Sequence, residues 1–358
     1  MNDFRPGLEG VIAFETEIAE PDREGSALRY RGVDIEELVG RHPFEQVWGL
    51  LVDGSFEPGM PRAERIELQD PSGSVMADLQ AGLATLGPKW RLRKLVDVTP
   101  EQAHDDLARL SAGALSIVAQ AARGADEPPV PELTVRQGEN AAAQFLIRWR
   151  GETNHRHVRA LDTYWVTAAE HGLNASTFTA RIAASTGADC AAAMSAAVGT
   201  LSGPLHGGAP ARVLPMLDAV EKSGDAEGYV RDLLARRERI MGFGHRVYRA
   251  EDPRARVLKR TAEELGSPRF EVADAFERAA HEALREAHPE RQLPTNVDFW
   301  AAVVLDLAGI PHDMYPAMFA CARVAGWSAH IIEEKRTGRL IRPSARYVGP
   351  PPRHLAEA

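Results

Sequence analysis

The chain has 358 residues, with 42 Lys and Arg against 51 Asp and Glu, so its formal net charge is −9. Hydrophobic residues make up 44% of the sequence and charged residues 26%, which excludes a disordered, collagen-like or coiled-coil chain. A single hydrophobic core stops growing near about 250–300 residues, so we expect two domains, or one large domain with a satellite.

The N-terminal residues and the cysteine count indicate the cellular compartment, and the N-terminal residues also predict a small β-hairpin. Residues 1–10 (MNDFRPGLEG) lack the basic start and apolar core of a signal peptide, so we expect a cytoplasmic protein. Cys190 and Cys321 are too few for a disulfide framework or a multi-thiolate metal site, which fits a reducing compartment. Residues 11–19 and 27–32 flank the turn-like segment PDREG and predict a β-hairpin.

Helical periodicity dominates the rest of the chain. Pro43 suits the first position of a helix, apolar residues recur after it at three- and four-residue spacing, and Gly54 is a natural stop. No train of alternating strands separates the helical segments, so the sequence predicts an all-α fold with a minor N-terminal β-hairpin. The other predicted helices span residues 101–123, 155–171, 175–186, 189–201, 211–222, 226–240, 270–287, 297–307 and 326–337.

The alanine-rich segment 182–201 needs to be weighed as a membrane span. It contains Asp189 and two glycines, and alanine is too weakly apolar to offset an aspartate in the bilayer. We therefore predict a buried helix that packs closely against another helix, and no membrane partner.

The first candidate site is residues 203–208 (GPLHGG), where proline and glycines bracket His206 just before a helix. Glycine permits a close backbone approach to a ligand. Taken alone, the segment is better explained as an ordinary interhelical loop with a surface histidine.

The second candidate is residues 242–249 (GFGHRVYR), which contain His245 and lie in a basic region. Residues 231–260 carry ten Lys/Arg and four Asp/Glu, a charge of +6 within an acidic chain. Arginine presents a planar fork suited to carboxylate and phosphate, although a charge run is most often only a solvated face. The segment lacks the Gly-Lys-Ser/Thr of a phosphate-binding P-loop. It also lacks the interleaved aromatic residues that stack on nucleic acid, which disfavours that partner.

The third candidate is residues 294–300 (PTNVDFW), which open a predicted helix and place Asp298 in its first turn. Carboxylates are common there because they complement the helix dipole, and the same position would hold a carboxylate ionised and ready to accept a proton. Three weaker candidates are His171, Arg323 and Arg342. Arg323 lies in an apolar run, where a guanidinium needs an anionic partner. His155 and His157 are spaced like two ligands of a metal site, but the sequence suggests no third ligand. We therefore predict no metal site.

Together these segments resemble the citrate synthase family, in its shorter bacterial form. The resemblance also includes GLEGV at residues 7–11, LRYRGVDIE at 28–36, Arg323 to His330 and LIRP at 340–343, and it is weak across residues 58–135. It implies an all-α homodimer with a large domain at 1–206 plus 309–358, a small domain at 207–308, and the site in the cleft between them. The N-terminal extension that carries NADH regulation in longer relatives is not recognised, which makes such regulation doubtful.

The resemblance also implies roles for individual residues. Asp298 would remove a proton from the methyl group of acetyl-CoA, His206 would stabilise the enol oxygen and His245 would polarise the ketone of oxaloacetate. His171, Arg254 and Arg323 would bind substrate carboxylates, Arg342 would come from the partner subunit, and Arg246 and Arg249 would contact coenzyme A. The coenzyme A thioester is a substrate, and no tightly bound cofactor is implied.

Residue chemistry agrees with these roles. A thioester α-hydrogen is far less acidic than a carboxylic acid, and each unit of pKa mismatch adds roughly 1.4 kcal/mol, so a donor must stabilise the enolate oxygen as well. A dianionic substrate explains several arginines in one cleft. Two other functions stay open: a 2-methylcitrate synthase that uses propionyl-CoA, because one methylene discriminates by only about 1–3 kcal/mol, and a non-catalytic sensor of coenzyme A or carboxylates on the same fold.

Overall fold

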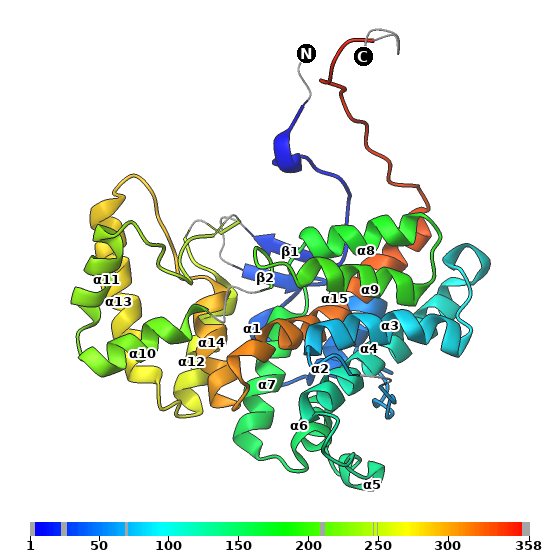
Figure 1. Cartoon of the computed structure of the whole chain (residues 1–358), viewed down its shortest axis with the longest axis horizontal. Coiled ribbons are helices and arrows are strands. Elements are labelled where there is room, and N and C mark those ends of the chain that lie inside the picture. The colour runs from blue at the N-terminus through cyan, green and yellow to red at the C-terminus, as the bar shows by residue number, and fades with distance from the viewer. Residues whose placement is uncertain are drawn as a thin grey trace.

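The structure, a computed structural model, describes residues 4–22, 27–68, 71–207, 212–245, 247–248 and 250–352. Its described part is built from α-helices, with one small antiparallel sheet in the order β1-β2-β3 (Figure 1). The all-α prediction is therefore confirmed.

The predicted hairpin is present but its first strand is displaced. Strand β1 (Ala19–Asp22) pairs with β2 (Ala27–Tyr30), which pairs with the two-residue β3 (Val33–Asp34). The predicted first strand, residues 11–19, was wrong, since β1 begins only at Ala19. The residues before it bond to the helices instead: the Glu17 amide donates to the Glu333 carboxylate at 3.0 Å, and Ile18 is buried. The sheet is fastened to the helices by Tyr30, whose hydroxyl lies 3.1–3.2 Å from the carbonyl oxygens of Val166, Thr167 and Glu170.

Most predicted helices are confirmed, with ends shifted by a few residues. Pro43 is the N-cap residue, immediately before the helix, and not its first helical residue. Gly54 ends that helix in the left-handed region, with φ 73°. The confirmed helices are α2 (Phe44–Asp53), α4 (Pro100–Arg123), α7 (His155–Ala168), α8 (Ala175–Ser185), α9 (Cys190–Leu201), α10 (Leu214–Ser223), α11 (Ala226–Ala235), α13 (Phe270–Ala287) and α14 (Val297–Leu307).

The predicted helix 326–337 is the C-terminal part of a longer helix, α15 (Tyr315–Thr337). Gly326 therefore lies inside the helix and does not start it. Its amide donates to the carbonyl of Ala169, 3.2 Å away, and a Cβ at this position would lie 2.7 Å from that oxygen. The sequence prediction missed five helices, which are α1 (Ile35–Leu38), α3 (Val75–Trp90), α5 (Glu132–Val135), α6 (Ala141–Arg150) and α12 (Pro253–Glu264).

Helix α15 is the centre of the larger group of helices. It is buried along nearly all its length and packs against α2, α4, α7, α8 and α9. A second group lies to the other side in Figure 1, where α10, α11 and α13 pack on one another and α12 packs on α14. Both α12 and α14 contact α7, so α7 connects the two groups.

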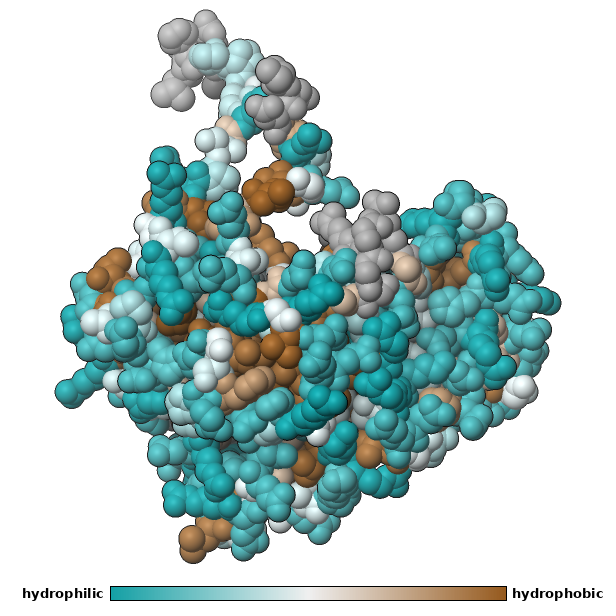
Figure 2. Space-filling view, turned by 180° about the vertical axis from the view of Figure 1, so that it is seen from behind, coloured by the Kyte–Doolittle hydropathy of each residue, from teal (hydrophilic) through white to brown (hydrophobic). Residues whose placement is uncertain are grey.

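The two ends of the described chain project from the same edge of the molecule (Figure 1). They contact each other where the Arg346 guanidinium lies 5.5 Å from the centre of the Phe4 ring. Apolar side chains are exposed on both, at Leu8 and Ile12 in one segment and at Val348 in the other. From behind, the molecule is mainly hydrophilic, with a hydrophobic area near its middle (Figure 2). No helix in the described ranges has the length and hydropathy of a membrane span.

Candidate active site

Two loops from the second group of helices are held side by side, and they carry His245 and Asp298. Phe243 pairs with Thr295, the Gly244 amide donates to the Pro294 carbonyl at 2.7 Å, and the Asn296 side chain donates to the Gly244 carbonyl at 3.0 Å. Asn296 also caps α14 by accepting from the Asp298 amide at 3.0 Å. The loop that carries the histidine thus lies against the start of α14, which carries the carboxylate.

Gly242 makes this approach possible. Its φ is 87°, and a Cβ there would lie 2.7 Å from the Cβ of Phe299 at the start of α14. A larger residue at 242 would be strained in backbone conformation and would push the two loops apart.

Arg254 is fixed beside His245 by a carboxylate that the sequence prediction did not assign to the site. Asp252 is fully buried and accepts from Arg254 Nε at 2.9 Å and from Nη2 at 2.8 Å, a two-pronged ion pair. Asp252 also accepts from the Val297 amide at 3.0 Å, which ties the start of α12 to the start of α14. Arg254 Nη2 lies 3.1 Å from Nε2 of His245.

His171, at the end of the α7 segment, completes this cluster. Its Nε2 lies 3.1 Å from the hydroxyl of Tyr248, and its ring centre lies 5.4 Å from that of His245. Burial and the charge of Arg254 lower the pKa of His171 well below its usual value, and the same two causes lower the pKa of His245 to about 4. Both rings are therefore neutral at pH 7.

Both nitrogens of the neutral His245 ring face hydrogen-bond donors. Nδ1 accepts from the amides of Val247 at 2.9 Å and Tyr248 at 3.0 Å, while Nε2 faces the guanidinium of Arg254 at 3.1 Å. A guanidinium can only donate and a neutral imidazole has one acceptor nitrogen, so the two sets of donors compete. A substrate oxygen held near Arg254 would offer Nε2 an acceptor instead.

Asp298 has the environment of a general base. Burial raises its pKa to about 6, an effect that the positive charge of Arg254 only partly opposes and that the charge of Asp252 reinforces. A carboxylate with a pKa near the working pH is a stronger base than an exposed one and is still mostly ionised at pH 7.

His206 lies in a second cluster, around Arg323. Its Nε2 is 2.8 Å from the hydroxyl of Ser176 on α8, and its ring centre is 5.9 Å from that of Phe319 on α15. Arg323 is buried, with Nε donating to the Ala168 carbonyl at 3.1 Å and its guanidinium 4.6 Å from the Phe319 ring centre. Burial, followed by the charge of Arg323, lowers the pKa of His206 to about 4.

The structure thus gathers most of the predicted residues into two clusters that interact through charge, because Arg323 also helps to lower the pKa of His171. Arg342 is exposed in the projecting C-terminal segment. Arg246 and Arg249 lie outside the described residues.

Sequence reasoning missed Asp252, Tyr248 and Ser176 as parts of the site. Asp252 precedes Pro253, and an aspartate before a proline is a helix-start signature that could have indicated both α12 and its buried cap. Tyr248 and Ser176 carry no such local signal, since their contacts are made with residues distant in sequence.

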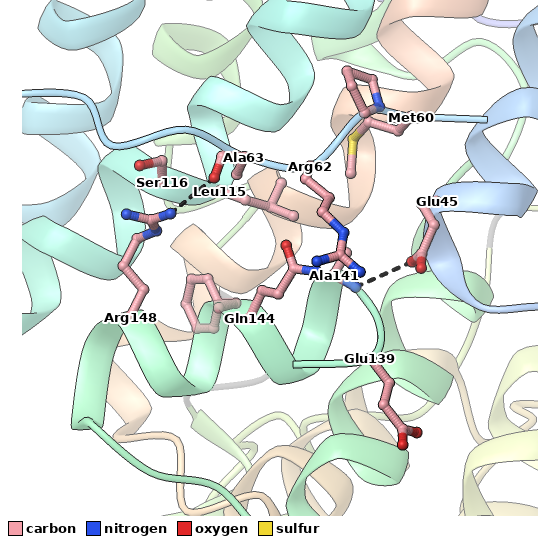
Figure 3. A pocket seen from close by; sticks show the side chains of 12 residues that line it. Glu45, Met60, Arg62, Ala63, Leu115, Ser116, Glu139, Ala141, Gln144 and Arg148 are labelled. Carbon is pink, nitrogen blue, oxygen red and sulfur yellow. Dashed lines mark hydrogen bonds between the residues drawn. The ribbon is translucent and has the colours of Figure 1, made fainter. Parts of the chain in front are cut away.

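A cavity of about 50 Å³ lies elsewhere, between α2, α4 and α6 (Figure 3). Three of its polar side chains are already bonded within the protein: Glu45 accepts from the Ala141 amide, Gln144 donates to Gly138 and Arg148 pairs with Glu132. None of the predicted site residues lines it. Among the residues described, no group of three or more His, Cys, Asp or Glu could hold a metal ion.

The chain is similar to known proteins over nearly its whole length. Residues 7–344 match the family described as "Citrate synthase, C-terminal domain". The chain is 61% identical over 352 residues to the Mycobacterium bovis protein named "Putative citrate synthase 2", covering 98% of this chain and 94% of that one. It is 33% identical to the 2-methylcitrate synthase of Shewanella oneidensis, covering 98% of this chain and 96% of that one.

A solved structure is also similar to this chain. The citrate synthase of Thermoplasma acidophilum, in a ternary complex with carboxymethyl coenzyme A and oxaloacetate, is 28% identical to this chain, with a TM-score of 0.83 and 99% of each chain covered. The fold and the matches define an enzyme, an acyltransferase, as the motifs predict. The chain belongs to the citrate synthase family.

Proposed function

We propose that this enzyme condenses acetyl-CoA with oxaloacetate and hydrolyses the resulting thioester to citrate and coenzyme A. The observation that carries the proposal is the similarity, over 99% of both chains, to a citrate synthase bound to oxaloacetate and a coenzyme A analogue. In this reaction Asp298 takes a proton from the acetyl methyl group, and the enolate carbon attacks the ketone carbon of oxaloacetate. The Nε2–H of His245 donates to the ketone oxygen as that oxygen gains the electron pair.

His206 is proposed to stabilise the enolate oxygen. Ser176 Oγ donates its proton to Oδ1 of Asn174 at 2.9 Å and receives the indole N–H of Trp327 at 3.2 Å, so it acts as an acceptor toward Nε2 of His206. The ring proton of His206 is then at Nε2, and its donation to the substrate requires the bond to Ser176 to be exchanged. A neutral imidazole donor aimed at a developing oxyanion is typically worth a few kcal/mol.

Binding of substrate carboxylates is proposed for His171, Arg254 and Arg323, because buried cations and a neutral donor suit a dianion. We also propose the domain division 1–206 plus 309–358 and 207–308. With it, His171, His206 and Arg323 belong to the large domain and His245, Arg254 and Asp298 to the small one, so that closure would assemble the site and exclude water. Arg246 and Arg249 are proposed contacts of coenzyme A, and the cytoplasmic location stays a prediction.

Steady-state kinetics test the substrate assignment. We expect kcat/KM with oxaloacetate to be about tenfold or more higher for acetyl-CoA than for propionyl-CoA, since a pocket shaped for a methyl group rejects an extra methylene by about 1–3 kcal/mol. The measurement is release of the coenzyme A thiol. A higher kcat/KM for propionyl-CoA would instead make the chain a 2-methylcitrate synthase, the function of its Shewanella relative. Binding of both substrates without thiol release would indicate a sensor.

A homodimer in which Arg342 reaches the partner's site is the last part of the proposal. It is supported by the exposure of Arg342 on a segment that projects from the body (Figure 1). For Arg342→Ala we expect citrate affinity to fall about tenfold or more, the loss of a charge-assisted hydrogen bond, with the mass in solution unchanged. Arg339→Ala, on the same exposed segment, is the matched control and should bind citrate normally.

Mixed dimers show whether the Arg342 that serves a site comes from the same chain or from the partner subunit. A dimer of one Arg342→Ala chain and one Asp298→Asn chain contains one complete site only if Arg342 acts across the interface. At limiting substrate, recovery of activity above that of either variant alone supports the proposal, and no recovery in verified mixed dimers contradicts it.

A further inference from the structure

A histidine that the proposed mechanism does not use contacts the segment that leads into Asp298. His281 lies on α13 and is partly buried, with Nε2 2.8 Å from the hydroxyl oxygen of Thr295. Thr295 is buried, comes three residues before Asp298, and is the residue that pairs with Phe243 where the two loops meet. A side chain of α13 is therefore bonded to the place where the His245 loop and the Asp298 segment touch.

The ring of His281 contacts the other member of that pair as well. Its centre lies 5.4 Å from the centre of the Phe243 ring, with the two planes 79° apart, which is a favourable edge-to-face contact. The Phe243 ring centre in turn lies 5.4 Å from that of Phe299, which directly follows Asp298. His281 thus contacts both residues of the bridge, one through a hydrogen bond and the other through its ring.

The segment before Asp298 is bonded residue by residue to different elements. The Val297 amide donates to the cap of α12, and the Asn296 side chain donates to the neighbouring loop, both at 3.0 Å. Thr295 is bonded to α13 by the histidine. Loss of the bond to α13 would therefore release the first of the three residues, while the bonds of the other two remain.

Glu277 gives α13 a second contact with this part of the chain, beyond Asp298. It lies one turn before His281 on the same face of the helix, and its carboxylate accepts from Trp300 Nε1 at 3.0 Å. Trp300 comes two residues after Asp298, so α13 is bonded to the chain on both sides of the proposed base. Glu277 also accepts from Lys259 of α12 at 2.8 Å, so its removal would disturb more than Asp298. His281 is therefore the residue on which the contact can be tested.

We propose that His281 is a positioning residue for proton abstraction, which acts through Thr295 to keep Asp298 within reach of the acetyl-CoA methyl group. The proposal rests on the proposed function, in which Asp298 is the base. A general base must lie within hydrogen-bond distance of the proton that it removes, and a displacement of about 1 Å can reduce the rate about 100-fold. His281 itself contacts no substrate in this role.

His281→Phe keeps a ring against Phe243 and removes the nitrogen that bonds to Thr295. We expect kcat to fall about tenfold or more, while the KM for oxaloacetate stays unchanged because its proposed ligands lie on other segments. Proton removal becomes the slow step, so kcat of the variant should be lower with acetyl-CoA deuterated in its methyl group than with the ordinary thioester. The measurement is release of the coenzyme A thiol. Unchanged kcat, or a fall in kcat with no isotope effect, overturns the proposal.

His281→Gln is the variant that should restore the rate. Burial lowers the pKa of His281, so its ring is neutral at pH 7, and a glutamine amide is also neutral and can both donate and accept. We expect kcat to return close to the wild-type value. If His281→Gln is as slow as His281→Phe, the hydrogen bond to Thr295 is not what acts on Asp298, and the proposal is contradicted.

Thr295→Val removes the same hydrogen bond from the other side, and it carries the test if His281→Phe does not fold. It should lower kcat by about as much as His281→Phe, and the double variant should be no slower than either single variant, because all three lack the same bond. Losses that multiply in the double variant would refute a shared action. If the wild-type chain releases no thiol, the proposed function fails, while the melting temperatures still test the contact. The drop in the double variant should be smaller than the sum of the two single drops, and a drop equal to that sum refutes the contact.

His288→Phe is the matched control. His288 is exposed at the C-terminal end of the same helix, so the same substitution there should leave kcat, the isotope effect and the melting temperature unchanged. A loss equal to that of His281→Phe would mean a general disturbance of α13 and would contradict a specific action on Asp298.

Discussion

Asparagine in place of Asp298 is expected to abolish most turnover and, at the same time, to stabilise the fold at pH 7. The amide cannot accept the proton from the acetyl-CoA methyl group, and general bases typically contribute about 10²- to 10⁴-fold to the rate. The stability gain arises because the ionised carboxylate is held in surroundings that disfavour charge, as its raised pKa shows. The function of this residue is therefore opposed to the stability of the protein.

The gain depends on pH in a defined direction. The pKa of Asp298 is about 6 in the folded chain and 3.8 when unperturbed, so the folded state binds the proton more tightly. The wild type thus loses stability from this group as the pH rises from about 4 to about 6, and Asp298→Asn escapes that loss. We expect the variant to be more stable by about 3 kcal/mol at pH 7 and about equally stable at pH 4.

Two measurements check this. Denaturant unfolding at the two pH values gives the free energies, and the wild-type kcat/KM should fall at low pH with an apparent pKa of about 6. Asp306→Asn, on the same helix but paired with Arg269, is the control and should keep full turnover. Near-normal kcat in Asp298→Asn would refute its role as the base, and a loss of stability at pH 7 would refute the account of its environment.

For Asp252→Asn we expect the largest loss of stability among single substitutions in the site, with turnover reduced as well. Breaking a buried ion pair by removing one partner leaves Arg254 uncompensated, which costs about 3–5 kcal/mol. The same carboxylate holds the Val297 amide, so α14 and Asp298 shift with it. A displacement of about 1 Å in a reacting group can reduce the rate about 100-fold.

The neighbouring acid is the control for this substitution. Glu251 is on the surface and pairs with Arg256, so Glu251→Gln should change stability by well under about 1 kcal/mol and leave kcat unaltered. Chemical unfolding and steady-state kinetics of both variants make the comparison. If Asp252→Asn is as stable and active as Glu251→Gln, the ion pair does not organise the site.

The sequence predicted those helices that have a clear apolar periodicity and residues typical of a helix start or end. Helices α13 and α14 begin and end where their periodicity begins and ends. Helix α3 was missed because its apolar pattern is weak and contains Pro88, and its burial comes from packing on α4 and α9. Such contacts between distant segments cannot be read from periodicity.

The site was predictable in its members but not in its supporting contacts. His171, His206, His245, Arg254 and Asp298 stand in motifs that can be compared with a family. Glu170 and Asp252 appear in the sequence as ordinary acidic residues, since an acid is most often exposed. Only the folded chain shows that both are buried, with Asp252 in an ion pair with Arg254 and Glu170 beside His330.

The hydroxyl of Tyr30 has a consequence for any shortened form of this enzyme. It lies against three main-chain oxygens at the end of α7, directly before His171, where the backbone would otherwise be left without partners in a dry interior. A chain trimmed past this tyrosine would lose none of the predicted site residues, yet the histidine that follows α7 would lose this support. The small N-terminal sheet therefore helps to hold the site although it carries no reacting group.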